Sequence, residues 1–200
     1  MAAPEVEAAF SARVAGHGLA PLAGLDDASR INIQLAIDLL DGTVVEPGAQ
    51  LSFDDVARTW DFREDPRYVW GWGTSSYGLI HMRGGGVCWV STALWRAALV
   101  GGLETDLRAN HYGLVRLLGA GTDATNTLVL RNNSSEPITV RAWVDDENVN
   151  VALFHEGNLG RSAQIRGPER LGPGRYALYQ DVTWADGTVT TSPFYSGYFW

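Results

Sequence analysis

The spacing of apolar residues predicts two helices in the first half of the chain. Between residues 26 and 42 apolar side chains recur every three or four positions, Asp26 or Asp27 can cap the start, and Gly42 can end the helix. A second helix is expected from about residue 89 to residue 103, within the stretch WVSTALWRAALVGGL. Both helices therefore precede most of the strand signals.

Strand patterns dominate the rest of the chain. Residues 43–53 contain two short apolar runs around a Pro-Gly pair, which predicts a hairpin, whereas residues 54–81 show no clean period and are expected to form a long loop with brief elements. Further strands are expected at 111–118, 126–132, 137–145, 148–154, 175–184 and 188–195.

This order predicts an α+β fold in a single domain, with N-terminal helices packed on a mostly antiparallel β-sheet. Residues 1–25, broken by glycines and a proline, are expected to be a lightly structured lead-in. Residues 26–154 would form the main domain, and residues 155–200 a C-terminal β extension packed on it.

Composition narrows the possible functions. The net charge of −8 argues against a nucleic-acid partner, since phosphate binding needs a basic face. All 15 basic residues are arginine, so Schiff-base lysine chemistry and a P-loop lysine are excluded. No apolar run approaches the about 18 residues of a membrane span, and no signal peptide is visible, which makes a cytoplasmic location without membrane contact the expectation. A single cysteine excludes an internal disulfide and a CxxC motif, and no metal or other cofactor is expected.

That cysteine, Cys88, follows three glycines and begins the second predicted helix, in the stretch MRGGGVCWVSTALW. The helix dipole and free backbone N–H groups at this position favour the nucleophilic thiolate. The same N–H groups can stabilise an oxyanion formed when the thiolate attacks a carbonyl. Glycines let a substrate or a neighbouring backbone come close, so Gly85 and Gly86 are candidate substrate-binding residues.

A thiolate nucleophile usually needs a base that a third group holds in place. His111 is expected to open the first strand after the helix, and Asp123 to precede the next strand. If the two strands are neighbours, the helix N-terminus carrying Cys88 would face an imidazole and a carboxylate. This chain order is similar to that of papain-like and transglutaminase-like thiol enzymes.

Each of these residues also has a structural interpretation. Cys88 could be a small buried apolar residue, and Asp123 could bond its own backbone in a turn. His81 lies near the glycines and is the alternative base. The aromatic residues are expected to be mainly core, with Trp89, beside the cysteine, and Trp72 as candidate walls of a substrate pocket.

The stretch GGGVCWVSTALWRAALVGGLE resembles the signature of VanW-like domains, and the resemblance extends over residues 31–154. The upstream NIQLAIDLLDGTVVEPGAQLSFDDV and the downstream RANHY and GTDAT match further family blocks. The resemblance implies that residues 26–154 are a VanW-like catalytic domain. This chain departs from the family at Trp89, where glutamine is usual, and that departure favours a more apolar substrate than cell-wall peptide.

A looser resemblance is to the small stand-alone bacterial Dieckmann cyclases, which release tetramic acids or pyridones in polyketide–nonribosomal peptide antibiotic biosynthesis. It implies that Cys88 accepts a β-ketoacyl aminoacyl group from a carrier-protein phosphopantetheine thioester. His111 would then remove a proton and Asp123 would orient the imidazole. Two alternatives stay open: a cysteine peptidase or amidase acting on cell-wall peptide, and a non-catalytic VanW-like binding module.

Overall fold

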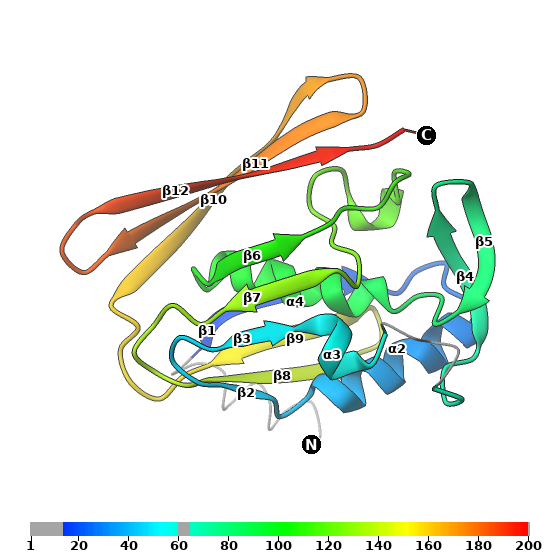
Figure 1. The fold of residues 1–200 in the computed structure, drawn as a ribbon, viewed down its shortest axis with the longest axis horizontal. Helices are drawn as coiled ribbons and strands as arrows, with labels where there is room; N and C mark the ends of the chain where they lie inside the picture. The colour runs from blue at the N-terminus through cyan, green and yellow to red at the C-terminus, as the bar shows by residue number, and fades with distance from the viewer. Residues whose placement is uncertain (1–13, 60–64, 200) are drawn as a thin grey trace.

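The computed structural model describes residues 14–59 and 65–199, and it has a mixed α+β fold in which the described strands pair antiparallel (Figure 1). Four small sheets replace the one expected sheet. Among the described helices, none combines the length and hydropathy needed to cross a lipid bilayer. The N-terminal residues 1–13 of the expected lead-in lie outside the described part.

The largest sheet forms the base for the long helix α4 (Cys88–Val100). Its strand order is β1 (Val14–Pro21), β9 (Asn148–Phe154), β8 (Ile138–Val144) and β2 (Val44–Val45). Helix α4 packs on β1 so closely that a Cβ on Gly16 or Gly18 would lie 2.1 Å from a helix carbonyl oxygen. The prediction of a lightly structured lead-in was wrong from residue 14 onward, because these glycines permit close packing rather than break structure.

The second sheet has the order β3 (Gln50–Ser52), β7 (Leu128–Arg131) and β6 (Glu104–Arg108). The hairpin predicted over residues 43–53 is wrong, because β2 pairs with β8 and β3 pairs with β7 instead. Each short run thus joins a different sheet, which local sequence cannot specify. The short helix α3 (Phe53–Ala57) follows β3 directly.

The two helices predicted from apolar spacing are confirmed. Helix α2 (Asp27–Leu40) begins at Asp26, whose carboxylate accepts the backbone N–H of Ser29 at 2.8 Å. Its buried face contains Ile33, Ala36, Ile37 and Leu40. Helix α4 runs from Cys88 to Val100, three residues shorter at its end than expected.

The segment expected to be a long loop contains a two-stranded hairpin, β4 (Trp70–Ser75) and β5 (Gly78–Arg83). Figure 1 shows it at one side of the molecule, beside the start of α2. Trp70 is 55% exposed, so the expectation that it belongs to the core was wrong, and Trp72, a candidate pocket wall, is 52% exposed. Trp95 on α4, by contrast, is fully buried.

The C-terminal part forms a third sheet of long strands, β10 (Arg161–Gly172), β11 (Arg175–Trp184) and β12 (Val189–Gly197). The strands predicted at 175–184 and 188–195 correspond to β11 and β12, whereas β10, which is largely exposed and rich in polar residues, was missed. The sheet packs on the rest of the chain through buried Leu178 and through Phe194, whose ring meets Trp95 edge-on.

Candidate thiol site at the start of helix α4

The glycine turn that precedes Cys88 is packed between a strand and a helix. Gly84 and Gly86 adopt positive φ values of 73° and 96°, which favour glycine. A Cβ on Gly85 would lie 2.5 Å from the carbonyl carbon of Gly71 in β4. The three glycines therefore serve the close approach of neighbouring backbone and fix the direction in which α4 starts.

The first turn of α4 has no side-chain cap, because Val87 occupies the cap position. The tight turn satisfies three backbone N–H groups: Val87 donates to Gly84, Trp89 to Gly86, and Val90 to Val87, at 2.9–3.2 Å. The N–H of Cys88 itself forms no hydrogen bond with any residue of the described ranges. Several free N–H groups were expected at this helix start. The N–H groups of Val87, Trp89 and Val90 are bonded, and that of Cys88 stays without a partner among the described residues.

His111 and Asp123 form a closely bonded pair. The Nδ1 atom of His111 lies 2.6 Å from Oδ2 of Asp123, and the same oxygen accepts the backbone N–H of His111 at 2.9 Å. Both side chains are almost fully buried, at 4% and 1% exposure. The carboxylate thus fixes the ring orientation and leaves the other ring nitrogen, Nε2, for a different partner.

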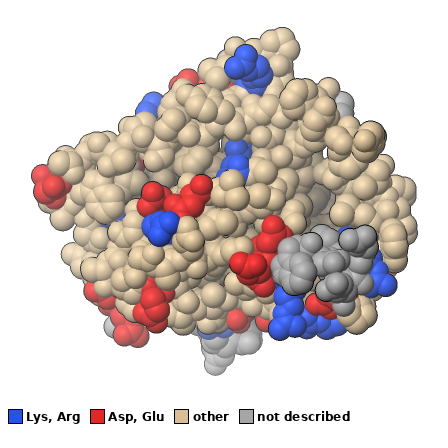
Figure 2. Space-filling view, in the orientation of Figure 1, with Lys and Arg blue, Asp and Glu red and all other residues tan. Residues whose placement is uncertain are grey.

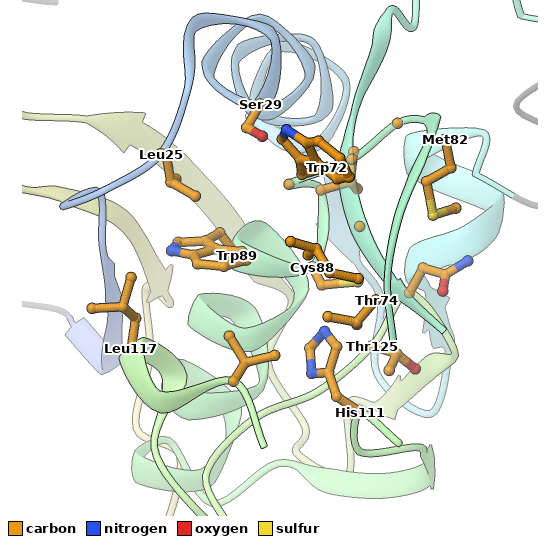
Figure 3. A pocket seen from close by; sticks show the side chains of 18 of the residues that line it. Leu25, Ser29, Trp72, Thr74, Met82, Cys88, Trp89, His111, Leu117 and Thr125 are labelled. Carbon is orange, nitrogen blue, oxygen red and sulfur yellow. The ribbon is translucent and has the colours of Figure 1, made fainter. Parts of the chain in front are cut away.

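Cys88 lies at the same cavity as His111. Burial lowers the pKa of His111, but the interactions with Asp123 and Cys88 outweigh it and raise the pKa to about 10. The charged form of the imidazole is therefore favoured. In Figure 3 the His111 ring points toward Cys88.

The second oxygen of Asp123 also has partners. Oδ1 accepts the hydroxyl of Tyr198 and, at 3.3 Å, a guanidinium N–H of Arg108. Burial opposes the charged form of Asp123, but the hydrogen bonds from His111 and Tyr198 hold its pKa below the usual 3.8. Sequence reasoning missed Arg108 and Tyr198, since neither belongs to a recognisable pattern with the cysteine.

The backbone positions of the pair differ from those predicted. The strand expected at 111–118 is a loop that ends in a short 3₁₀ helix, η1 (Arg116–Leu118), and the strand after α4 is β6. His111 and Asp123 therefore lie on loops between β6 and β7, not on strands. Apolar residues of this loop line the cavity or, like Leu118, enter the core, which produced the strand-like pattern.

Hydrogen bonds join the Asp123 loop to the side of α4. The Thr92 hydroxyl donates to the carbonyl of Ala124 and accepts its N–H, both at 3.0 Å. Arg96 donates to the Thr122 carbonyl at 3.0 Å. These contacts, one and two turns along the helix from Cys88, set the distance between the thiol and the buried pair.

A cavity of about 380 Å³ opens in front of Cys88 (Figure 3). All four predicted substrate-binding residues line it: Trp72, Gly85, Gly86 and Trp89. The other wall side chains include apolar ones, namely Leu25, Leu79, Met82, Val115 and Leu117, and polar ones, among them Asp26, Ser29, Thr74, Thr125 and Asn126. The indole N–H of Trp89 donates to the Pro21 carbonyl at 2.7 Å, so its ring is fixed at the cavity wall.

His81, the alternative base, does not line the cavity. Its exposed ring packs against Trp70 and Trp72, with ring centroids 5.7 and 5.5 Å apart. The cavity therefore brings Cys88 together with His111 and not with His81.

The surface carries no extended basic patch on the face shown in Figure 2, where acidic and arginine side chains occur in small mixed groups. Within the described ranges, no group of three or more His, Cys, Asp or Glu side chains is placed to hold a metal ion.

Fold and site define a class: an α+β protein whose cysteine, at a helix start, lines the same cavity as a histidine that is bonded to a buried aspartate. The family described as VanW like protein matches residues 28–154, and the chain belongs to this family. No curated protein and no solved structure matches the chain significantly.

Proposed function

We propose that the protein is a cysteine-dependent acyl-transfer enzyme in which Cys88 is the nucleophile, His111 the acid and base, and Asp123 the group that orients His111. The observation that carries the proposal is the position of His111, which is hydrogen-bonded to Asp123 and lines the same cavity as Cys88. A thiolate–imidazolium pair at a helix N-terminus is the arrangement that nucleophilic thiol chemistry requires.

In the first step, the Cys88 thiolate attacks a thioester carbonyl of the substrate. The tetrahedral intermediate collapses by breaking the bond to the carrier thiol, and the His111 imidazolium gives its proton to that leaving thiolate. The products are an acylated Cys88, a free carrier thiol and a neutral His111. Once the thiolate is consumed, the contribution of Cys88 to the raised pKa of His111 is lost, so the ring becomes a competent base.

In the second step, we assign a Dieckmann cyclisation. Neutral His111 removes the acidic proton between the two carbonyls of a β-ketoacyl aminoacyl group. The carbanion attacks the Cys88 thioester carbonyl, a carbon–carbon bond forms, and the thiolate leaves. The cycle ends with the original thiolate–imidazolium pair and a tetramic acid or pyridone.

The cavity supports an apolar acyl substrate. Its wall is mainly apolar around Cys88, and the indole of Trp89 lies where the family usually has a polar glutamine. A volume of about 380 Å³ falls within the range of small-molecule sites. The unpaired N–H of Cys88 supplies one donor to the oxyanion of each tetrahedral intermediate.

The test uses the N-acetylcysteamine thioester of an N-acetoacetyl amino acid, with intact-mass spectrometry and product analysis. The expected result is an acyl adduct on Cys88, release of N-acetylcysteamine and a cyclic product. Cys88→Ala, which preserves the apolar character of the position, serves as the control and should form neither adduct nor product while remaining folded.

Other outcomes of the same experiment separate the alternatives. Release of the linear free acid would favour a hydrolase over a cyclase. No thiol release from this substrate and no cleavage of cell-wall peptide would contradict an enzymatic function and leave the binding module.

A further inference from the structure

We infer that the C-terminal tail, residues 196–199, is a working part of the thiol site, with Tyr198 as the residue that positions Asp123. This inference rests on the proposed function of Cys88 and His111. The family match ends at residue 154, so the tail lies outside the part of the chain that the family defines. In Figure 1 the end of β12 runs to the loop that follows β6.

Tyr198 holds one oxygen of the Asp123 carboxylate. Its hydroxyl donates to Oδ1 and accepts the backbone N–H of Gly121 at 2.7 Å, so both roles of the hydroxyl are used. The side chain is 9% exposed. Burial and the nearby carboxylate raise the pKa of Tyr198, and the hydroxyl therefore stays a donor over the working pH range.

The two oxygens of Asp123 have separate tasks. Oδ2 receives both N–H groups of His111, while Oδ1 receives Tyr198 and Arg108. A carboxylate held on one oxygen only could turn about its Cβ–Cγ bond and lose the in-plane approach of the imidazole. Hydrogen bonds to a carboxylate are strong, so the Tyr198 contact fixes the plane in which His111 is held.

The rest of the tail is bonded to the loop that carries His111. Phe199 donates its N–H to the carbonyl of Tyr112 at 2.9 Å, and the two rings stack with centroids 4.5 Å apart. The Asn110 amide donates to the Gly197 carbonyl at 2.8 Å.

Arg108, at the end of β6, links the tail to the buried carboxyl group. It donates to the Ser196 hydroxyl at 2.9 Å and to the carbonyl of Asp123 at 2.8 Å. The tail thus runs alongside residues 108–112 and contacts this loop on both sides of His111.

The test compares Tyr198→Phe with Tyr195→Phe, a matched change in β12, just before the tail, at a side chain that is 64% exposed. Alkylation of Cys88 by iodoacetamide is measured from pH 4 to pH 9 for both variants and the unaltered protein. In Tyr198→Phe, Asp123 loses a donor that stabilises its charge, so the acid limb of the rate profile should move to higher pH. Turnover should fall about 10- to 100-fold, which is the range for losing a hydrogen bond to a charged group. Tyr195→Phe should leave both the acid limb and the turnover unchanged.

The outcomes separate the inference from the proposed function. Fast alkylation in all three proteins with the same acid limb would overturn the role of Tyr198 and leave the nucleophile intact. Slow alkylation of the unaltered protein would overturn the proposed function itself. A stability loss in Tyr198→Phe without any shift of the acid limb would show a purely structural role and would also overturn the inference.

Discussion

The two ends of helix α4 differ in whether their backbone N–H and C=O groups have hydrogen-bond partners outside the helix. At the start, no side chain caps the helix, the Cys88 N–H has no partner in the described ranges, and a cavity lies in front of it. At the other end, the buried amide of Gln180 lies 2.8 Å from the Leu99 carbonyl and 3.3 Å from those of Ala98 and Leu103. The start of α4 thus leaves the Cys88 N–H without a partner among the described residues, while carbonyls at the other end accept hydrogen bonds from a side chain.

The C-terminal sheet lies near both ends of α4 but makes different contacts at each. At the far end Gln180 of β11 and Arg161 of β10 donate to the last carbonyls, with Arg161 reaching Gly101 at 3.3 Å. At the start, the tail after β12 bonds to the loops that carry His111 and Asp123. The same sheet therefore donates directly to one end of α4, whereas near the other end it contacts the loops that line the cavity.

The largest expected effect is the loss of activity in His111→Ala. Without the imidazole, no group protonates the leaving thiol or removes the substrate proton, so turnover should fall at least about 100-fold. Steady-state release of thiol from the model thioester measures this loss. The melting temperature monitors folding, and unchanged turnover in a folded variant would refute the role assigned to His111.

Gln180→Leu should lower the stability of the fold and leave the reactivity of Cys88 unchanged. Removing the amide takes one hydrogen bond from each of the carbonyls of Ala98, Leu99 and Leu103, which should cost about 1–3 kcal/mol in the free energy of unfolding. Urea denaturation measures this cost, and alkylation of Cys88 should keep its rate. Gln164→Leu, at an exposed position of β10, is the matched control and should change stability little. A large change in Cys88 reactivity would show that the two ends are not independent.

The buried pair at the start of α4 should also affect stability in acid. Because the pKa of Asp123 is lowered on folding, its stabilising contribution is present above about pH 4 and is lost as the pH falls through the folded value. Urea midpoints measured between pH 3 and pH 6 should fall steeply in the unaltered protein. The decrease should be shallower in Asp123→Asn, and identical slopes would contradict the lowered pKa.

The smallest effect is expected at the start of α2, which has the side-chain cap that α4 lacks. Asp26→Ala should destabilise the protein by about 1 kcal/mol through loss of the bond to the Ser29 N–H. Thermal unfolding provides the measurement. Asp27→Ala, one residue into the same helix and without the cap bond, is the control and should cost less.

Local pattern was sufficient for part of the fold and for the choice of site residues. Helical spacing and cap residues predicted α2 and α4, and the glycine-cysteine stretch singled out Cys88 at a helix start. His111 and Asp123 were chosen from chain order and from the family resemblance; they are bonded to each other, and His111 lines the same cavity as Cys88.

Other features depend on long-range contacts that no local pattern encodes. β1 forms a strand because Gly16 and Gly18 allow α4 to pack on it. This role of the two glycines can be seen only when the helix is in place. β2 and β3 belong to different sheets, although their sequence resembles a hairpin. Tyr198 reaches Asp123 from 75 residues away in the chain.

The most direct test of the central claim compares the alkylation rate of Cys88 at pH 6 in the folded protein and in 8 M urea. An ordinary unfolded thiol has a pKa of about 8.5 and is almost entirely protonated at this pH, so it reacts slowly. If His111 and the helix start stabilise the thiolate, the folded protein should react with iodoacetamide faster than the unfolded chain. A folded protein that reacts more slowly than the unfolded chain would show a buried, inert cysteine and would contradict the account.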